Sequence, residues 1–396
     1  MSLTRGRFAA RMGVCVALLA ALVLVSPGVG TASATYGWWD VWRAKLGLDI
    51  RGDDLVDRPL VDIDGDATVS AQELDGFVRA ARSIFDQRFP RTLLALQVGI
   101  TLALCGAAFQ TLFRNPLATP YTLGIASGGS LGALVAIRLG WRAAILGIPV
   151  LAFAAFAGGI AVVAMVFALG RGSIRRGAHA KPPHAPGHPP TMSGRGLTSN
   201  ELLLAGVTMG LFCSAMMMLV TVISSQRETF AIVRWMMGSL DPVAPLEGAV
   251  LLPLMLPAWV VLILSARALN QYRLGDEIAA SRGVRVSRLQ GACVLVATLA
   301  TAAVVARCGP VGFVGLVVPH VAALIFGRDS RILMPASALI GGAFLIICDW
   351  ASQLAMRFAG WLTGQHLASS TLPIGVVTAL VGVPIFLVLL RARRHA

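Results

Sequence analysis

Residues Arg88 to Gly132 read RFPRTLLALQVGITLALCGAAFQTLFRNPLATPYTLGIASGGSLG. A long apolar run is followed by a polar break at Arg114–Pro120 and then by a second, glycine-studded apolar run. One crossing of a bilayer needs about 20 mostly apolar residues. The stretch therefore predicts two membrane-spanning helices joined by a short turn.

The whole chain has the composition of a membrane protein. Hydrophobic residues make up 56% of its 396 residues and charged residues only 13%, whereas soluble domains carry about 25% charged residues. We therefore expect an all-α polytopic membrane protein with about ten transmembrane helices. The apolar segments of suitable length are 12–30, 91–112, 121–139, 143–170, 201–224, 246–268, 289–308, 310–327, 332–354 and 373–391.

Two features refine this picture. Glycines recur at four-residue spacing, which allows close approach of helix backbones; they are Gly124, Gly128 and Gly132, and then Gly206 and Gly210. The segment 310–327 is short and contains Pro310, Pro319 and His320. We expect its backbone to be broken and covered by neighbouring helices.

Charge and cysteine content exclude several functions. The formal charge of +14 comes from arginines in short loops beside apolar segments, where basic residues set orientation, so nucleic acid is not an expected partner. A phosphate-binding loop needs lysine after glycine, but Lys45 and Lys181 both follow alanine, so this chain should bind no nucleotide. All cysteines lie in or beside apolar segments and should be buried thiols: Cys15, Cys105, Cys213, Cys293, Cys308 and Cys348.

The distribution of arginines predicts a multi-pass protein of the cell (inner) membrane with both termini in the cytoplasm. Residues 1–34 form either a retained first transmembrane helix or a secretory signal peptide, because Ala32-Ser33-Ala34 resembles a cleavage site. Residues 35–87 form an extracytoplasmic insertion. The rest, 88–396, should be the membrane core with a Pro/Gly/His-rich, disordered cytoplasmic loop at 171–196.

Five motifs in order carry a family resemblance: arginine near Pro90, Asn115–Ala118 (NPLA), Leu274–Val284 (LGDEIAASRGV), Gly309–His320 (GPVGFVGLVVPH) and Leu372–Pro384 (LPIGVVTALVGVP). The chain resembles, from Arg88 to Arg394, the permease subunits of iron-siderophore, haem and cobalamin ABC importers of the FecCD type (type II importers). The resemblance implies ten helices per subunit and a homodimer, with two cytoplasmic ATPase subunits and an extracytoplasmic substrate-binding protein as partners. It implies transport of a metal chelate, with ATP hydrolysis on the separate subunits.

The coupling helix of that family, which docks in the ATPase, resembles residues 275–283. The residue types in this segment also predict a short helix. Acidic residues lie at its start, an arginine lies at its end, and a glycine follows in position to cap it. The coupling residues implied are Gly275, Asp276, Glu277, Ala280, Arg282 and Gly283. A plain connector is the alternative.

The arginines that the family uses to dock the binding protein match Arg88 and Arg91, since guanidinium groups suit carboxylate capture. Gln353 stands where relatives often carry arginine, and Arg357 follows one helical turn later. Interfacial snorkelling of the arginines is the alternative. Asp349 and His320 lie in apolar runs, and for both we expect helix packing rather than substrate contact.

Residues 62–73 match a twelve-residue calcium loop of the EF-hand type. Six oxygen donors fall at the required positions: Asp62, Asp64, Asp66, Thr68, Ser70 and Glu73. Position six, normally glycine, is Ala67, whose left-handed conformation costs on the order of 1 kcal/mol. Calcium is therefore the only cofactor that the sequence indicates, and a solvated acidic loop is the alternative.

Two other functions stay open at this point. A secondary transporter without an ATPase would need intramembrane charged relays, and the apolar segments contain few charges. A membrane receptor could use the calcium loop as its functional element. An ATPase partner that co-purifies with the chain would distinguish an importer from both.

Calcium should order the insertion and orient Arg88 and Arg91. Titration of a 48–88 peptide with calcium is expected to release or absorb heat and to raise its helical circular dichroism. A peptide that shows neither change would contradict the calcium site.

Overall fold

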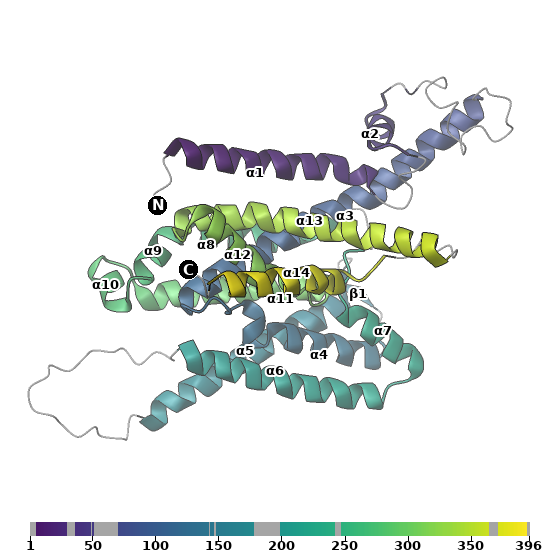
Figure 1. The fold of residues 1–396 in the computed structure, drawn as a ribbon. Helices are drawn as coiled ribbons and strands as arrows, with labels where there is room; N and C mark the ends of the chain where they lie inside the picture. Colours follow the sequence, from purple (N-terminus) through teal and green to yellow (C-terminus); the bar gives the residue numbers. More distant parts are fainter. Residues whose placement is uncertain are drawn as a thin grey trace, which may run out of the picture. The chain divides into compact units, whose positions relative to one another are not determined.

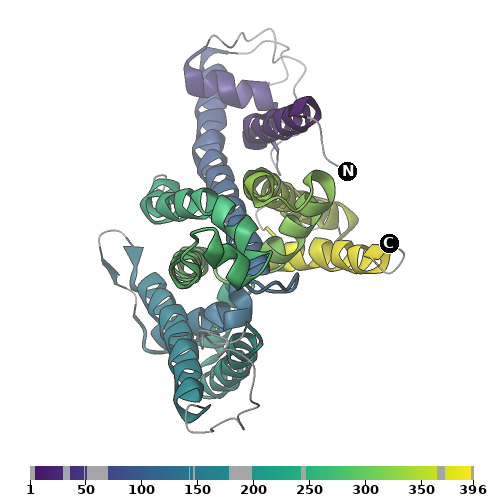
Figure 2. The same cartoon turned by 90° about the vertical axis from the view of Figure 1, so that its left-hand side faces the viewer.

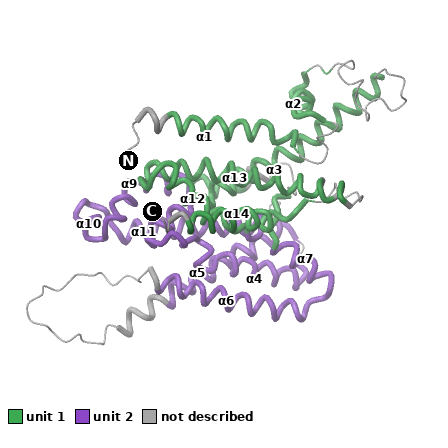
Figure 3. The backbone as a smooth tube through the Cα atoms, viewed as in Figure 1, with its two compact units in different colours: residues 1–104, 237–257, 311–396 green, residues 105–236, 258–310 purple. Residues whose placement is uncertain are grey.

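The computed structural model describes residues 5–29, 36–48, 50, 70–141, 143–145, 148–177, 199–241, 247–363 and 371–393. Their regular secondary structure is helical apart from one short antiparallel hairpin, in which Ala144 pairs with Pro149 and Ile145 with Ile148. They divide into two compact units (Figure 3), namely 1–104 with 237–257 and 311–396, and 105–236 with 258–310.

In the first unit, α1, α12 and α14 each pack against α13 (Figure 1). The helices of this unit are α1 (Arg5–Val25), η1 (Ser26–Gly28), α2 (Trp38–Leu46), α12 (Val314–Phe326), α13 (Ser330–Thr363), α14 (Ile374–Arg393) and most of α3 (Ala71–Leu112).

In the second unit, α4 packs against α5, α6, α7 and α11, and these helices lie together in both views (Figures 1 and 2). Its elements are η3 (Pro120–Leu123), α4 (Ile125–Arg138), β1 (Ala144–Ile145), β2 (Ile148–Pro149), α5 (Val150–Gly177), α6 (Ser199–Val222), α7 (Gln226–Met236), α9 (Ala266–Tyr272), α10 (Asp276–Ser281) and α11 (Val286–Cys308). Helix α8 (Glu247–Leu264), like α3, contributes residues to both units.

The prediction of a polytopic helical membrane protein is confirmed. Among the described residues, six helices are long and apolar enough to cross a membrane, and α8 with α9 forms a further candidate bent by 50°. Three shorter apolar helices, α4, α12 and α14, complete the set. All ten predicted apolar segments thus coincide with helices.

Helix α3 differs from the sequence-based expectation. The apolar segment that the sequence indicates starts at residue 91, but one helix runs without interruption from Ala71 to Leu112, with Pro90 inside it. Its start has a capping box, since Ser70 N–H donates to the Glu73 carboxylate (2.9 Å) and Glu73 N–H to Ser70 Oγ (3.3 Å). The insertion therefore continues directly into a membrane span.

The predicted break in 310–327 exists, but it lies before the helix. Gly309 and Phe313 have φ of +69° and +66°, and α12 begins at Val314. Pro319 lies inside the helix, and His320 is buried. The left-handed Phe313 packs so closely on α14 that a Cβ on Gly382 would lie 2.6 Å from its own Cβ.

Helices α2 and α7 were not predicted. Helix α2 packs on the N-terminal part of α3 through a cluster of Ala44, Ile50, Phe77 and Ala81. Its length of 9 residues is too short to show a membrane-type apolar run.

Helix α7 buries Ile232 against Leu134 and Met217. It begins with a second capping box, because the N–H of Ser225 donates to the Glu228 carboxylate (2.7 Å). Hydrogen bonds from the backbone and the side chain of Ser225 hold the pKa of the Glu228 carboxyl below its usual value. Serine followed three residues later by glutamate is a sequence signal for a helix start. The segment was not predicted because it contains no long apolar run.

The glycine spacing has the predicted structural role. A Cβ on Gly128 of α4 would lie 2.5 Å from the carbonyl oxygen of Gly158 in α5. A Cβ on Gly206 of α6 would lie 2.2 Å from the carbonyl oxygen of Thr122. Only hydrogen fits at these positions, so the glycines set the distance between the helices.

Candidate functional site

Helix α10 forms where the sequence predicted the coupling helix. Asp276 and Glu277 lie in its first turn, where carboxylates interact favourably with the helix dipole. At its end Gly283 has φ of +83°, and the N–H groups of Gly283 and Val284 donate to the carbonyls of Ala280 and Ala279, both at 3.0 Å. This is the Schellman arrangement, for which glycine is the favoured residue.

The surface of α10 combines charge with apolar side chains. Leu274 and Ile278 are 57% and 44% exposed, and Glu277 and Arg282 are exposed beside them, whereas Ala279 is buried. Exposed apolar side chains rimmed by charge are typical of a protein contact surface. All six predicted coupling residues lie on this segment.

Arg114 supports α10 from the polar break after α3. Its guanidinium donates to the Asp276 carboxylate (2.5 Å) and to the carbonyl of Tyr272 (2.7 Å), and it lies 4.5 Å from the centre of the Tyr272 ring. The break itself turns because Leu117 N–H donates to Asn115 Oδ1 (2.9 Å). Both members of the ion pair are about half exposed, so it positions α10 more than it stabilises the fold.

Sequence reasoning missed this function of Arg114. Two opposite charges in loops predicted to lie on the same side of the membrane were the only available signal. That signal is weak, because many basic residues occupy the same side.

A second polar cluster surrounds Arg91 in the first unit. Its Nε donates to Asp349 Oδ1 (2.7 Å), and its Nη1 pairs with Asp241. Gln353 Nε2 donates to the other oxygen of Asp349 (2.9 Å), and Ser239 Oγ donates to Asp241 (2.7 Å). The Arg91 and Asp349 side chains are only 10% and 2% exposed. We refer to these five residues as the Arg91 cluster.

The cluster gives Arg91 a structural role that the docking prediction did not include. Its guanidinium already binds two carboxylates of its own chain, so it is a structural group in this conformation. The expectation that Asp349 serves helix packing agrees with this geometry. Gln353 supplies a neutral donor to the buried carboxylate.

Arg88 is half-buried, and its Nη1 donates to the carbonyl of Pro27 (3.2 Å). Arg357 lies on α13, and its side chain is outside the described residues. Of the two predicted docking arginines whose side chains are described, Arg88 is half-buried and Arg91 is buried.

Most of the predicted calcium loop lies outside the described residues: Asp62, Asp64, Asp66 and Thr68. Ser70 and Glu73 are described, and they pair with each other at the start of α3, with Ser70 Oγ 2.7 Å from the Glu73 carboxylate. Among the residues that the structure covers, no group of three or more His, Cys, Asp or Glu is placed to hold a metal. The calcium site stays a prediction.

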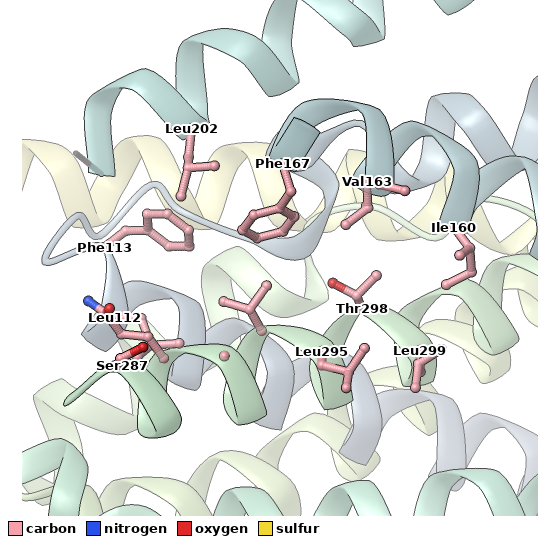
Figure 4. A pocket seen from close by; sticks show the side chains of 14 residues that line it. Leu112, Phe113, Ile160, Val163, Phe167, Leu202, Ser287, Leu295, Thr298 and Leu299 are labelled. Atoms are coloured by element: carbon pink, nitrogen blue, oxygen red, sulfur yellow. The ribbon is translucent and has the colours of Figure 1, made fainter. Parts of the chain in front are cut away.

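A pocket of about 420 Å³ lies within the second unit (Figure 4). Its walls come from α5, α11, the end of α3 and the start of α6, and most of the lining is apolar. The lining residues are Leu112, Phe113, Ile160, Val163, Ala164, Phe167, Leu202, Ser287, Gln290, Gly291, Val294, Leu295, Thr298 and Leu299.

A family model described as the FecCD transport family matches residues 13–181 and 191–392. The chain belongs to the FecCD transport family. Members similar to it include an uncharacterized ABC transporter permease protein, YvrB, of Bacillus subtilis, at 34% identity over 78% of both chains. The cobalamin import system permease protein BtuC of Halobacterium salinarum is 36% identical, over 77% of this chain and 72% of that protein.

The vitamin B12 import system permease protein BtuC of Escherichia coli is 33% identical, over 78% of this chain and 84% of that protein. A solved structure described as an inward-facing conformation of a metal-chelate type ABC transporter covers 97% of this chain with a TM-score of 0.69 at 24% identity. This FecCD protein is thus a multi-pass ABC importer permease subunit and is not itself an ATPase. Family membership excludes the secondary-transporter alternative.

Removing Arg91 should strongly destabilise the FecCD protein, because Asp349 would remain buried without a counter-charge. We expect Arg91→Met to cost about 3–5 kcal/mol, and the double variant Arg91→Met/Asp349→Leu to recover much of that loss. Thermal unfolding in detergent measures both. Arg79→Met is the control, since its ion pair with Asp75 is 71% and 63% exposed and should contribute under about 1 kcal/mol. Equal effects of Arg91→Met and Arg79→Met would contradict the assignment.

Proposed function

We propose that this FecCD permease imports a metal chelate of the cobalamin class, delivered by a binding protein and driven by ATPase subunits that dock on α10. The observation that carries the proposal is α10 itself. It is a capped helix with exposed Leu274, Ile278, Glu277 and Arg282, held in position by Arg114. Closure of an ATPase pair against such a helix would move the adjoining α9 and α11.

The substrate class is supported by the relatives, two of which are named for cobalamin or vitamin B12 import. Iron-siderophore and haem chelates belong to the same proposal, because the family resemblance includes their importers. A homodimer with a central path, two ATPase subunits and a binding protein on the outer face form the proposed assembly.

The proposed topology places α10 and both termini in the cytoplasm. Retention of α1 is supported by its packing on α13 and by the hydrogen bond from Arg11 to the Ile325 carbonyl (2.7 Å). Arg88, Arg91 and Arg357 remain the proposed docking arginines for the binding protein, on the family resemblance alone. Calcium in the 62–73 loop remains proposed on the sequence pattern alone.

Proteoliposomes with the permease, its ATPase and its binding protein should take up radiolabelled cobalamin in a saturable, ATP-dependent manner. Arg114→Ala should lower uptake and substrate-stimulated ATP hydrolysis together, because α10 would lose its support while the membrane fold is kept. Leu211→Ala on α6, where Leu211 is 68% exposed, is the matched control and should transport normally. Uptake of no metal chelate by the intact complex would contradict the proposed function.

A further inference from the structure

The pocket of the second unit is elongated along α11. Ser287, Gly291, Leu295 and Thr298 follow one another along one face of that helix (Figure 4). A rise of 1.5 Å per residue makes the distance from Ser287 to Thr298 about 16 Å. Half of the hydrocarbon thickness of a bilayer is roughly 15 Å, so the pocket has the length of one leaflet.

The lining is mostly apolar, with Val163, Phe167 and Leu295 in its walls. Ser287 and Gln290 contribute two polar groups at the α10 end, which we call the polar end, and Thr298 contributes one hydroxyl at the other end. The volume of about 420 Å³ lies within the usual range of roughly 300–1,000 Å³ for ligand pockets. A long apolar chain with a polar group at the α10 end fits such a lining.

Positive charge gathers at the polar end. Arg285 is the N-cap residue of α11 and Arg288 lies in its first turn, and both are exposed. The free N–H groups at the start of this 23-residue helix add partial positive charge. An anionic headgroup is the complementary partner.

We propose that this pocket binds the acyl chain of an anionic phospholipid from the cytoplasmic leaflet, with its headgroup at Arg285 and Arg288. The choice of leaflet rests on the proposed function, which places α10 in the cytoplasm. The chemistry of the site does not depend on that choice.

The site adjoins the support of the coupling helix. Gln290 lines the pocket, and its Nε2 donates to the hydroxyl of Tyr272 (2.9 Å). Tyr272 in turn lies beneath Arg114, the partner of Asp276. A lipid in the pocket would contact Gln290, which is hydrogen-bonded to the tyrosine that supports Arg114.

Full-length permease in detergent can be tested with phosphatidylglycerol and phosphatidylcholine of equal chain length by native mass spectrometry. We expect selective retention of phosphatidylglycerol. A photoreactive acyl chain on phosphatidylglycerol should label residues of the pocket. Labelling elsewhere, or equal retention of the two lipids, would overturn the proposal.

Two variants fill the pocket from opposite walls, namely Gly291→Phe on α11 and Ala164→Phe on α5. Both should weaken lipid retention roughly tenfold, a loss of about 1.4 kcal/mol. Gly13→Phe is the control, because Gly13 is also a helical glycine with nothing within 4 Å of an added Cβ. Unchanged retention in both filling variants would overturn the proposal.

Two further variants separate the headgroup from the chain. Arg285→Gln and Arg288→Gln should each weaken phosphatidylglycerol binding roughly fivefold and leave phosphatidylcholine unaffected. The buried Thr298 hydroxyl has no hydrogen-bond partner among the described residues, so Thr298→Val should not matter to an acyl chain. Loss of binding in Thr298→Val would instead indicate a ligand with a polar group deep in the pocket.

These outcomes are independent of the ATPase. Lipid labelling of the pocket without any co-purifying ATPase would support the lipid site and contradict the proposed function. Co-purification of an ATPase without labelling of the pocket would support the proposed function and contradict the lipid site.

Discussion

The buried ion pair between Arg91 and Asp349 is the constraint on which the first unit depends. A charged group in an apolar medium must be paired or must lose its charge. Arg91 satisfies this condition by binding carboxylates from α13 and from the segment after α7 at the same time. Three parts of the chain that lie far apart in sequence are thereby held together.

Backbone contacts extend this junction. The N–H groups of Ile374 and Gly375 donate to the carbonyls of Gly238 (3.2 Å) and Met237 (3.0 Å). Ser352 Oγ donates to the carbonyl of Leu372 (2.6 Å). The start of α14 is therefore fixed to the same two segments that Arg91 connects, so the LPIG motif contributes to a structural joint.

Arg114 forms an ion pair at a solvent-exposed site, in contrast to the buried ion pair of Arg91. Its ion pair with Asp276 is half exposed and contributes little to stability, but it fixes the position of α10 beside Tyr272. Arg91 thus connects buried segments of the first unit, and Arg114 positions the exposed helix that we propose as the ATPase contact. The degree of burial, not the residue type, separates the two functions.

The features that were predicted correctly from the sequence are those that depend on residues close together in the chain. The ten apolar segments, the glycine contacts and the capped α10 all follow from composition, spacing and helix-end signals that lie within short windows. Helices α2 and α7 were missed because they are short and carry polar residues, and the full length of α3 was missed because its apolar run begins only at residue 91. The pairing of Arg91 with Asp349 and of Arg114 with Asp276 joins distant segments, so only the fold could reveal which carboxylate each arginine binds.

The central claim is that the exposed face of α10 contacts an ATPase subunit. The most direct test is cross-linking from Ile278→Cys in a Cys15→Ala background, because the other cysteines, Cys105, Cys213, Cys293, Cys308 and Cys348, are buried. The account predicts a cross-link to the ATPase from Ile278→Cys and none from Leu211→Cys on α6. No cross-link from Ile278→Cys in a complex that hydrolyses ATP, or an equal yield from both positions, would contradict it.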